Sequence, residues 1–200
     1  TSAQALWIVD AYGFMIAGFL ITMGTLGDRI GRRKLLMVGA AAFGVASLMA
    51  AYSTSATILI AARAVLGVAG ATLMPSTLAL ISNMFNHPHQ RALAIGVWAT
   101  MFALGMAAGP VVGGILLAHY WWGAAFLVAL PVVGLLLVAA PFLLPEYRAP
   151  QQGRLDLSSV VLSLLALLPI VYGIKQLAKD GIVANATLAI VTGVAFMLLF

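Results

Sequence analysis

Residues 92–145 contain no Asp, Glu, Lys or Arg and read ALAIGVWATMFALGMAAGPVVGGILLAHYWWGAAFLVALPVVGLLLVAAPFLLP. Over the whole chain of 200 residues, 64% of the side chains are hydrophobic and 8% are charged. Soluble domains have about 45–50% apolar and about 25% charged residues. This composition excludes a soluble domain, a disordered chain and a nucleic-acid-binding domain, and the absence of cysteine excludes a disulfide-bonded secreted scaffold. The sequence therefore predicts an all-α integral membrane protein.

Uncharged runs of about 20 residues, the length that an apolar helix needs to cross a bilayer, occur along the whole chain. Dividing these runs at polar or turn-forming residues predicts about seven transmembrane helices. Very short connections, such as residues 53–55, require neighbouring helices to be antiparallel. The predicted spans are approximately 5–26, 35–52, 57–82, 92–117, 122–144, 158–176 and 183–200.

The basic residues indicate which side of the membrane is cytoplasmic. Lys175 and Lys179 lie on one side of the predicted topology, and Arg63 lies inside a span. The other seven of the ten basic residues share the opposite side: Arg29, Arg32, Arg33, Lys34, Arg91, Arg148 and Arg154. Because cytoplasmic loops are enriched in Lys and Arg, this side is predicted to be cytoplasmic. The net charge of +5 then requires no nucleic acid as a partner.

The two ends of the chain lead us to expect a piece of a longer protein. Thr1 is predicted to lie outside, at the start of an inward-running helix, with no signal-peptide pattern before it. The last apolar run is still open at Phe200. We therefore expect at least one further helix before residue 1.

The strongest local motif lies between the first two spans, where residues 24–34 read GTLGDRIGRRK. Its glycines permit a tight turn and close helix approach, and Asp28 can cap the next helix or pair with a basic group. Charge alone would favour a basic loop that only sets the topology. The full pattern resembles the G-x-L-x-D-R-x-G-R-[RK]-[RK] loop between helices 2 and 3 of major facilitator superfamily transporters. The resemblance implies a cytoplasmic gate formed by Gly24, Gly27, Asp28, Arg29, Gly31, Arg32 and Arg33.

Two later segments resemble further motifs of the same superfamily. Residues 59–71, LIAARAVLGVAGA, are similar to its fourth-helix motif with an intramembrane arginine, here Arg63, although Leu66 replaces the usual glutamine. Residues 105–114, GMAAGPVVGG, resemble the fifth-helix motif of drug:proton antiporters. A Gly-x-x-x-Gly packing face could occur in any membrane helix; the Gly-Pro and Gly-Gly pairs favour the exporter. The matched residues are Gly105, Gly109, Pro110, Gly113 and Gly114.

The beginning and the end of the chain resemble one branch of the superfamily. WIVDAY at residues 7–12 and RLDL at residues 154–157 are similar to the methyl-viologen and quaternary-ammonium exporters of the fourteen-helix drug:proton antiporter branch. The resemblance implies that the chain covers helices 2 to 8. Residues 1–144 would be the remainder of the N-terminal six-helix bundle, 145–157 a cytoplasmic connection, and 158–200 an inserted helix pair whose second helix is truncated.

Two charged residues inside the predicted spans are candidates for transport chemistry. Asp10 and Arg63 both lie about two turns into helices that run inward, so they share a depth near the external leaflet. Intramembrane charges usually face a bundle interior or an aqueous cavity. We expect Asp10 to alternate between protonation and attraction to a cationic substrate, with Arg63 modulating it through competing charge. The alternatives are a solvated residue at a helix start for Asp10 and a side chain reaching the outer surface for Arg63.

The resemblance implies proton-coupled efflux of hydrophobic cations, such as quaternary ammonium compounds, methyl viologen, dyes and biguanides, across a bacterial inner membrane by alternating access. Trp7 and Tyr12 could offer their π-faces to such a cation. The expected partners are these cations, protons and the lipid bilayer, with no cofactor, no metal and no nucleotide, because the chain lacks a phosphate-binding loop. The alternatives are a proton-coupled importer of a small metabolite and, more remotely, a membrane-embedded enzyme. The five acidic residues are too widely spread to favour an enzyme.

Overall fold

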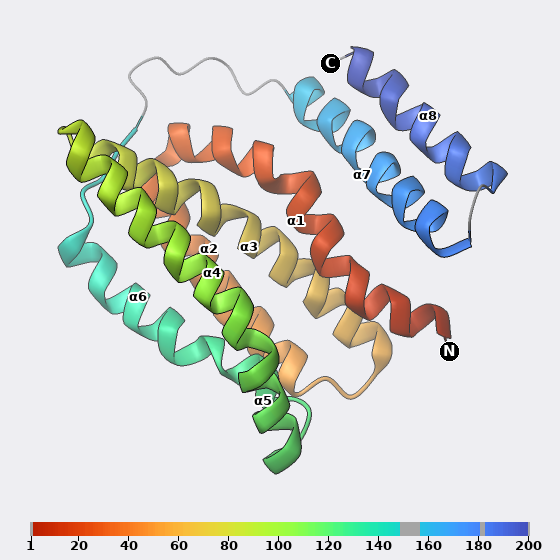
Figure 1. Ribbon diagram of the computed structural model, residues 1–200, viewed down its shortest axis with the longest axis horizontal. Helices are drawn as coiled ribbons and strands as arrows, with labels where there is room; N and C mark the ends of the chain where they lie inside the picture. Colours follow the sequence, from red (N-terminus) through yellow and green to blue (C-terminus); the bar gives the residue numbers. More distant parts are fainter. Residues whose placement is uncertain (1, 149–156, 181–182, 200) are drawn as a thin grey trace.

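The computed structural model describes residues 2–148, 157–180 and 183–199, and all of its regular elements in these ranges are α-helices (Figure 1). The helices run back and forth along the molecule, and the connections between successive helices from α1 to α6 are short. Their bounds are α1 Ser2–Ile30, α2 Arg32–Ala51, α3 Ala56–Met84, α4 Pro88–His119, α5 Ala124–Leu127, α6 Ala129–Leu143, α7 Leu157–Asp180 and α8 Ala184–Leu199.

Five segments are long and apolar enough to cross a membrane: Gln4–Ile30, Arg32–Ala51, Ala56–Met84, Pro88–His119 and Ala124–Leu143, the last comprising α5 and α6. Two shorter apolar helices follow at Leu164–Leu177 and Ala184–Leu198. Each of the seven coincides with a predicted span. The prediction of an all-α, multi-pass membrane protein is therefore confirmed.

The connection between the first two spans is shorter than the sequence predicted. α1 continues to Ile30 rather than ending near residue 26, and Gly31 alone separates it from α2. Of the motif glycines that could permit a tight turn, Gly24 and Gly27 lie inside α1. Glycine inside a helix costs only about 1 kcal/mol. The chain reverses at Gly31, whose φ of 109° is a conformation that suits glycine.

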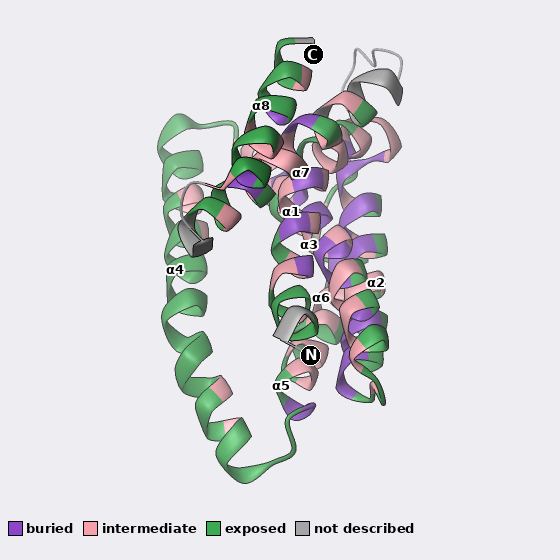
Figure 2. Cartoon of the chain, turned by 90° about the vertical axis from the view of Figure 1, so that its right-hand side faces the viewer, coloured by how far each residue is buried: buried purple, intermediate pink, exposed green. Residues whose placement is uncertain are grey.

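The core of the protein lies between α1, α2 and α3, which pack against one another (Figure 2). Its central cluster consists mainly of small residues: Ala46, Ala50, Ala62 and Leu66. Tyr12 of α1 packs against this cluster, as does Phe43 of α2. Helices in a membrane gain little from the hydrophobic effect, so small side chains that allow close backbone contact stabilise such packing. These three helices therefore form the packed core of the fold.

Two parts of the molecule lie outside this core. α4 has no buried residue and stands beside the bundle, as Figure 2 shows, with contacts to α3 and α5. It nevertheless remains one helix through Pro110. α7 and α8 pack together as a pair, and among the described residues this pair meets the remaining helices through α7 and α1 (Figure 1).

Candidate functional site

Asp10 of α1 forms an ion pair with Lys175 of α7. The Asp10 side chain is 25% exposed and that of Lys175 is 46% exposed. From the sequence, Lys175 was interpreted as a marker of topology, and its role as the partner of Asp10 was missed. The available signal was its position inside the predicted span 158–176, since a charge within a membrane span seeks an opposite charge. The contact joins the bundle to the α7–α8 pair.

Aromatic rings surround this ion pair. The ammonium nitrogen of Lys175 lies 5.1 Å from the centre of the Phe14 ring, within the range of a cation–π interaction. The ring of Trp7 lies beside that of Phe14, with 6.2 Å between the ring centres. These side chains open onto a cleft of about 380 Å³ between α1 and α7, which we call the α1–α7 cleft. It is lined by Leu6, Trp7, Asp10, Phe14, Tyr172, Lys175 and Gln176.

Arg63 of α3 reaches the same turn of α1 but binds its backbone. Its guanidinium donates hydrogen bonds to the carbonyl oxygens of Ile8 at 2.9 Å and Val9 at 3.2 Å. The same guanidinium lies 4.8 Å from the centre of the Tyr12 ring. Of the two aromatic candidates, Trp7 therefore lines the α1–α7 cleft, whereas Tyr12 contacts Arg63.

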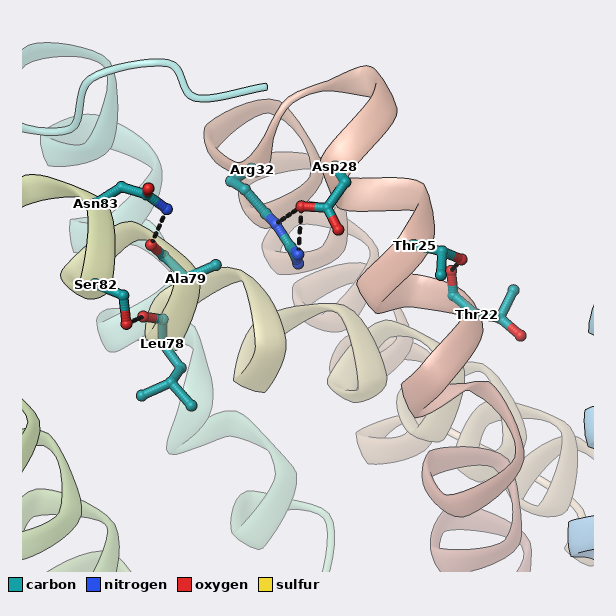
Figure 3. A network of polar contacts seen from close by, with 8 residues as sticks. All are labelled: Thr22, Thr25, Asp28, Arg32, Leu78, Ala79, Ser82 and Asn83. Carbon is teal, nitrogen blue, oxygen red and sulfur yellow. Dashed lines mark hydrogen bonds and ion pairs between the residues drawn. The ribbon is translucent and has the colours of Figure 1, made fainter. Parts of the chain in front are cut away.

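At the opposite end of α1, Asp28 and Arg32 form an ion pair across the junction with α2 (Figure 3). Nε and one terminal nitrogen of Arg32 donate hydrogen bonds to one oxygen of Asp28 at 3.0 and 2.6 Å. A Cβ atom on Gly27 would lie only 3.0 Å from Cδ of Arg32. The missing side chain at Gly27 thus leaves space for the arginine, which is 8% exposed, to fold back on Asp28. Of the two roles considered for Asp28, the structure has the ion pair.

Glu146, which follows α6, binds the start of α2, a role that no motif in the sequence indicates. Its carboxylate accepts a hydrogen bond of 3.1 Å from the backbone N–H of Arg33 and lies 3.8 Å from Nε of the same residue. The backbone N–H of Arg32 donates to the carbonyl of Tyr147 at 2.9 Å. The first N–H groups of a helix lack partners within it, and a carboxylate there is stabilising. Glu146 therefore caps α2 from a distant part of the chain.

Replacement of Gly31 by alanine is expected to lower the free energy of unfolding by about 1–3 kcal/mol. The positive φ strains any side chain, and the new Cβ would lie 2.6 Å from the carboxyl carbon of Glu146. Gly24→Ala is the matched control, because its Cβ would have one neighbour, Cβ of Pro75, at 4.0 Å. Thermal unfolding of the detergent-solubilised full-length gene product measures both. Equal melting temperatures for the two variants would contradict the expectation.

The glycines of the fifth-helix motif lie on α4, which carries none of the site residues described above. A Cβ atom on Gly105, Gly109, Gly113 or Gly114 would have no neighbour within 4 Å. Their spacing of four residues keeps Gly105, Gly109 and Gly113 on one face, because α4 is continuous from Pro88 to His119. No helix in the described part of the chain covers this face, so its role in helix packing stays a prediction.

The sequence of the whole chain, residues 1–200, matches the Major Facilitator Superfamily. It is 52% identical over 200 residues to the multidrug efflux pump LfrA of Mycolicibacterium smegmatis, covering 100% of this chain and 40% of that protein. It is 41% identical over 176 residues to the methyl viologen resistance protein SmvA of Salmonella typhimurium, covering 88% and 36% of the two proteins. It is 36% identical over 180 residues to the tetracenomycin C resistance and export protein of Streptomyces glaucescens, covering 90% and 33%. The chain thus spans 40% or less of the length of these relatives, and it belongs to the Major Facilitator Superfamily.

Proposed function

We propose that this chain forms part of a proton-coupled exporter of hydrophobic cations in a bacterial inner membrane. This proposal rests on the environment of the Asp10 side chain. Its carboxylate lies in an apolar helix beside an aromatic cleft and already binds a cation, the ammonium group of Lys175. A carboxylate next to aromatic faces suits a positively charged, lipophilic molecule.

The names of the relatives support export of this kind of molecule. Three of them are described as an efflux pump, a methyl viologen resistance protein and a resistance and export protein. One relative is named for resistance to methyl viologen, which is an aromatic dication. A molecule of this kind has the chemistry that Asp10 and its aromatic neighbours would bind. Membership of a transporter superfamily leaves no support for the membrane-embedded enzyme.

In the proposed cycle, Asp10 carries either a proton or the charge of the substrate. An ionised carboxylate in a low-dielectric site needs a counter-charge, which a bound cation supplies. A proton that binds Asp10 would neutralise the carboxylate and remove its attraction for the cation, and the cation would then be released. Arg63 would position this part of α1 through the carbonyl groups of Ile8 and Val9. Trp7 would contact the substrate from the α1–α7 cleft, whereas Tyr12 would support Arg63. Access would alternate between the two sides of the membrane.

The remaining candidate residues would act outside the cation site. The segment from Gly24 to Arg33, with Gly27, Asp28, Arg29, Gly31 and Arg32, would form the cytoplasmic gate, fastened by the Asp28–Arg32 pair and by Glu146. The glycine face of α4 would pack against helices of the complete transporter. In that transporter, residues 1–144 would belong to the N-terminal bundle, 145–157 to a cytoplasmic connection that lies largely outside the described residues, and 158–200 to an inserted helix pair.

Efflux of ethidium from cells that express the full-length gene product tests the proposal. We expect loaded cells to lose ethidium faster than cells with an empty vector, and a protonophore to remove the difference, because the proton gradient supplies the energy. Fluorescence of the cells over time is the measurement. Efflux that survives the protonophore would rule out proton coupling. No efflux above the vector would favour the alternative, an importer of a small metabolite.

A further inference from the structure

The proposed function does not explain why the inserted helix pair brings a lysine to Asp10. A lysine ammonium is a compact charge on a flexible stem of four carbons. Here it contacts the Asp10 carboxylate and lies 5.1 Å from the centre of the Phe14 ring. This is the combination of a carboxylate and an aromatic face that recognises a ligand cation. The ammonium group of Lys175 therefore shows that a positively charged group fits between the Asp10 carboxylate and the Phe14 ring.

The α1–α7 cleft around this cation has room for a ligand. Its volume of about 380 Å³ is within the range of small-molecule sites, about 300–1,000 Å³. Leu6, Trp7 and Tyr172 add apolar and aromatic surface beyond the ion pair. A lipophilic cation could therefore place its charge at Asp10 and its apolar body against these side chains.

We propose that Lys175 is a tethered competitor, whose ammonium group occupies the position that the charged group of a lipophilic cation takes in the α1–α7 cleft. This inference rests on the proposed function, because it identifies Asp10 as the carboxylate that binds the substrate. Asp10 then has three alternative partners: a proton, the ammonium group of Lys175 and the substrate cation. Lys175 neutralises the carboxylate whenever the other two are absent, which avoids an unpaired charge in an apolar site.

The exposure of the ion pair allows Lys175 to leave. Because 46% of its side-chain surface is not covered by the protein, the ammonium group of Lys175 has open space into which it can move away from Asp10. Exposed ion pairs are weak, so an arriving cation has to overcome only about a fivefold preference. Among the described residues, α7 contacts the bundle through α1 and does not contact α2 or α3. Exchange of Lys175 for a ligand therefore needs no repacking of the α1–α2–α3 core.

The test is equilibrium binding of ethidium to the purified full-length gene product, followed by the fluorescence anisotropy of ethidium. Removing the competitor with Lys175→Met, which keeps a side chain of similar length, should tighten binding about three- to fivefold. Lys175→Arg keeps the charge and should bind as the wild-type protein does. Lys179→Met is the matched control, because it removes the same charge one turn further along α7, and it should leave the affinity unchanged. Thermal unfolding of each variant verifies that it is folded.

Three results would overturn the inference. The first is unchanged, weaker or undetectable ethidium binding by folded Lys175→Met. The second is equal tightening by Lys179→Met, which would indicate a general effect of charge rather than competition at Asp10. The third is tightening that persists in the double variant Asp10→Asn with Lys175→Met. A different result would contradict the proposed function. Wild-type cells without protonophore-sensitive ethidium efflux would contradict it, even if the Lys175→Met protein bound ethidium more tightly.

Discussion

Replacement of Asp10 by asparagine is expected to reduce ethidium efflux by the full-length gene product more than about tenfold, to the level of an empty vector. Asparagine has nearly the shape of aspartate, but it carries neither the negative charge that attracts a cation nor a proton that could be exchanged. It also leaves the ammonium group of Lys175 without its carboxylate partner. The effect should therefore exceed that of changing a neighbouring aromatic residue. Efflux rates in cells, corrected for the amount of protein in the membrane, measure it.

Asp10→Glu is the matched control, since it keeps the carboxylate and shifts it by one methylene group. This variant should retain measurable efflux that still depends on external pH. Among the described residues, the charged and titratable groups around Asp10 include Lys175 and Tyr172 on α7, Arg63 on α3, and Tyr12 on α1 itself. Because these groups remain in both variants, a difference between Asn and Glu at position 10 reports on the carboxylate. An Asn variant with normal transport and normal pH dependence would refute the proton role of Asp10.

Replacement of Gly67 by alanine should disrupt the packing of α1 against α3. A Cβ atom at this position would lie 2.5 Å from the backbone oxygen of Tyr12 and 2.6 Å from Cβ of Met15. Neither atom belongs to the flexible end of a side chain, so α1 and α3 would have to move apart. Overpacking of this kind costs about 1–3 kcal/mol. The same separation would pull Arg63, one turn earlier on α3, away from Ile8 and Val9.

Gly70→Ala is the control for this prediction. It adds the same methyl group one turn later on α3, where the nearest atoms are Cδ1 of Ile16 at 3.5 Å and the hydroxyl oxygen of Tyr12 at 3.6 Å. These are ordinary contacts, so this variant should unfold close to the wild-type temperature. Melting temperature and the monodisperse fraction in detergent are the measurements. If Gly67→Ala is as stable as Gly70→Ala, the close approach of α1 and α3 is not what stabilises the bundle.

The motif at the junction of α1 and α2 indicated the family of the chain but not the position of the turn. The motif at residues 24–34 identified the superfamily correctly, and the whole chain matches that family. The same motif was interpreted as a glycine-rich turn, whereas the turn consists of Gly31 alone. Its φ of 109° occurs where α1 reverses into α2, with Glu146 bound at the start of α2. A pattern of residues along the chain does not contain that geometry.

Composition and run length were sufficient to predict membrane-spanning helices, their approximate bounds and the basic side, because these properties depend on residues near one another in the chain. The partners of the charged residues depended on the packing of distant segments. Asp10 and Lys175 are 165 residues apart, and Arg33 and Glu146 are 113 residues apart. Whether such residues meet is decided by which helix packs beside α1 and α2, since an ion pair requires contact within a few ångströms. A charge inside a span indicates that a partner is needed, but local sequence does not specify which distant residue is that partner.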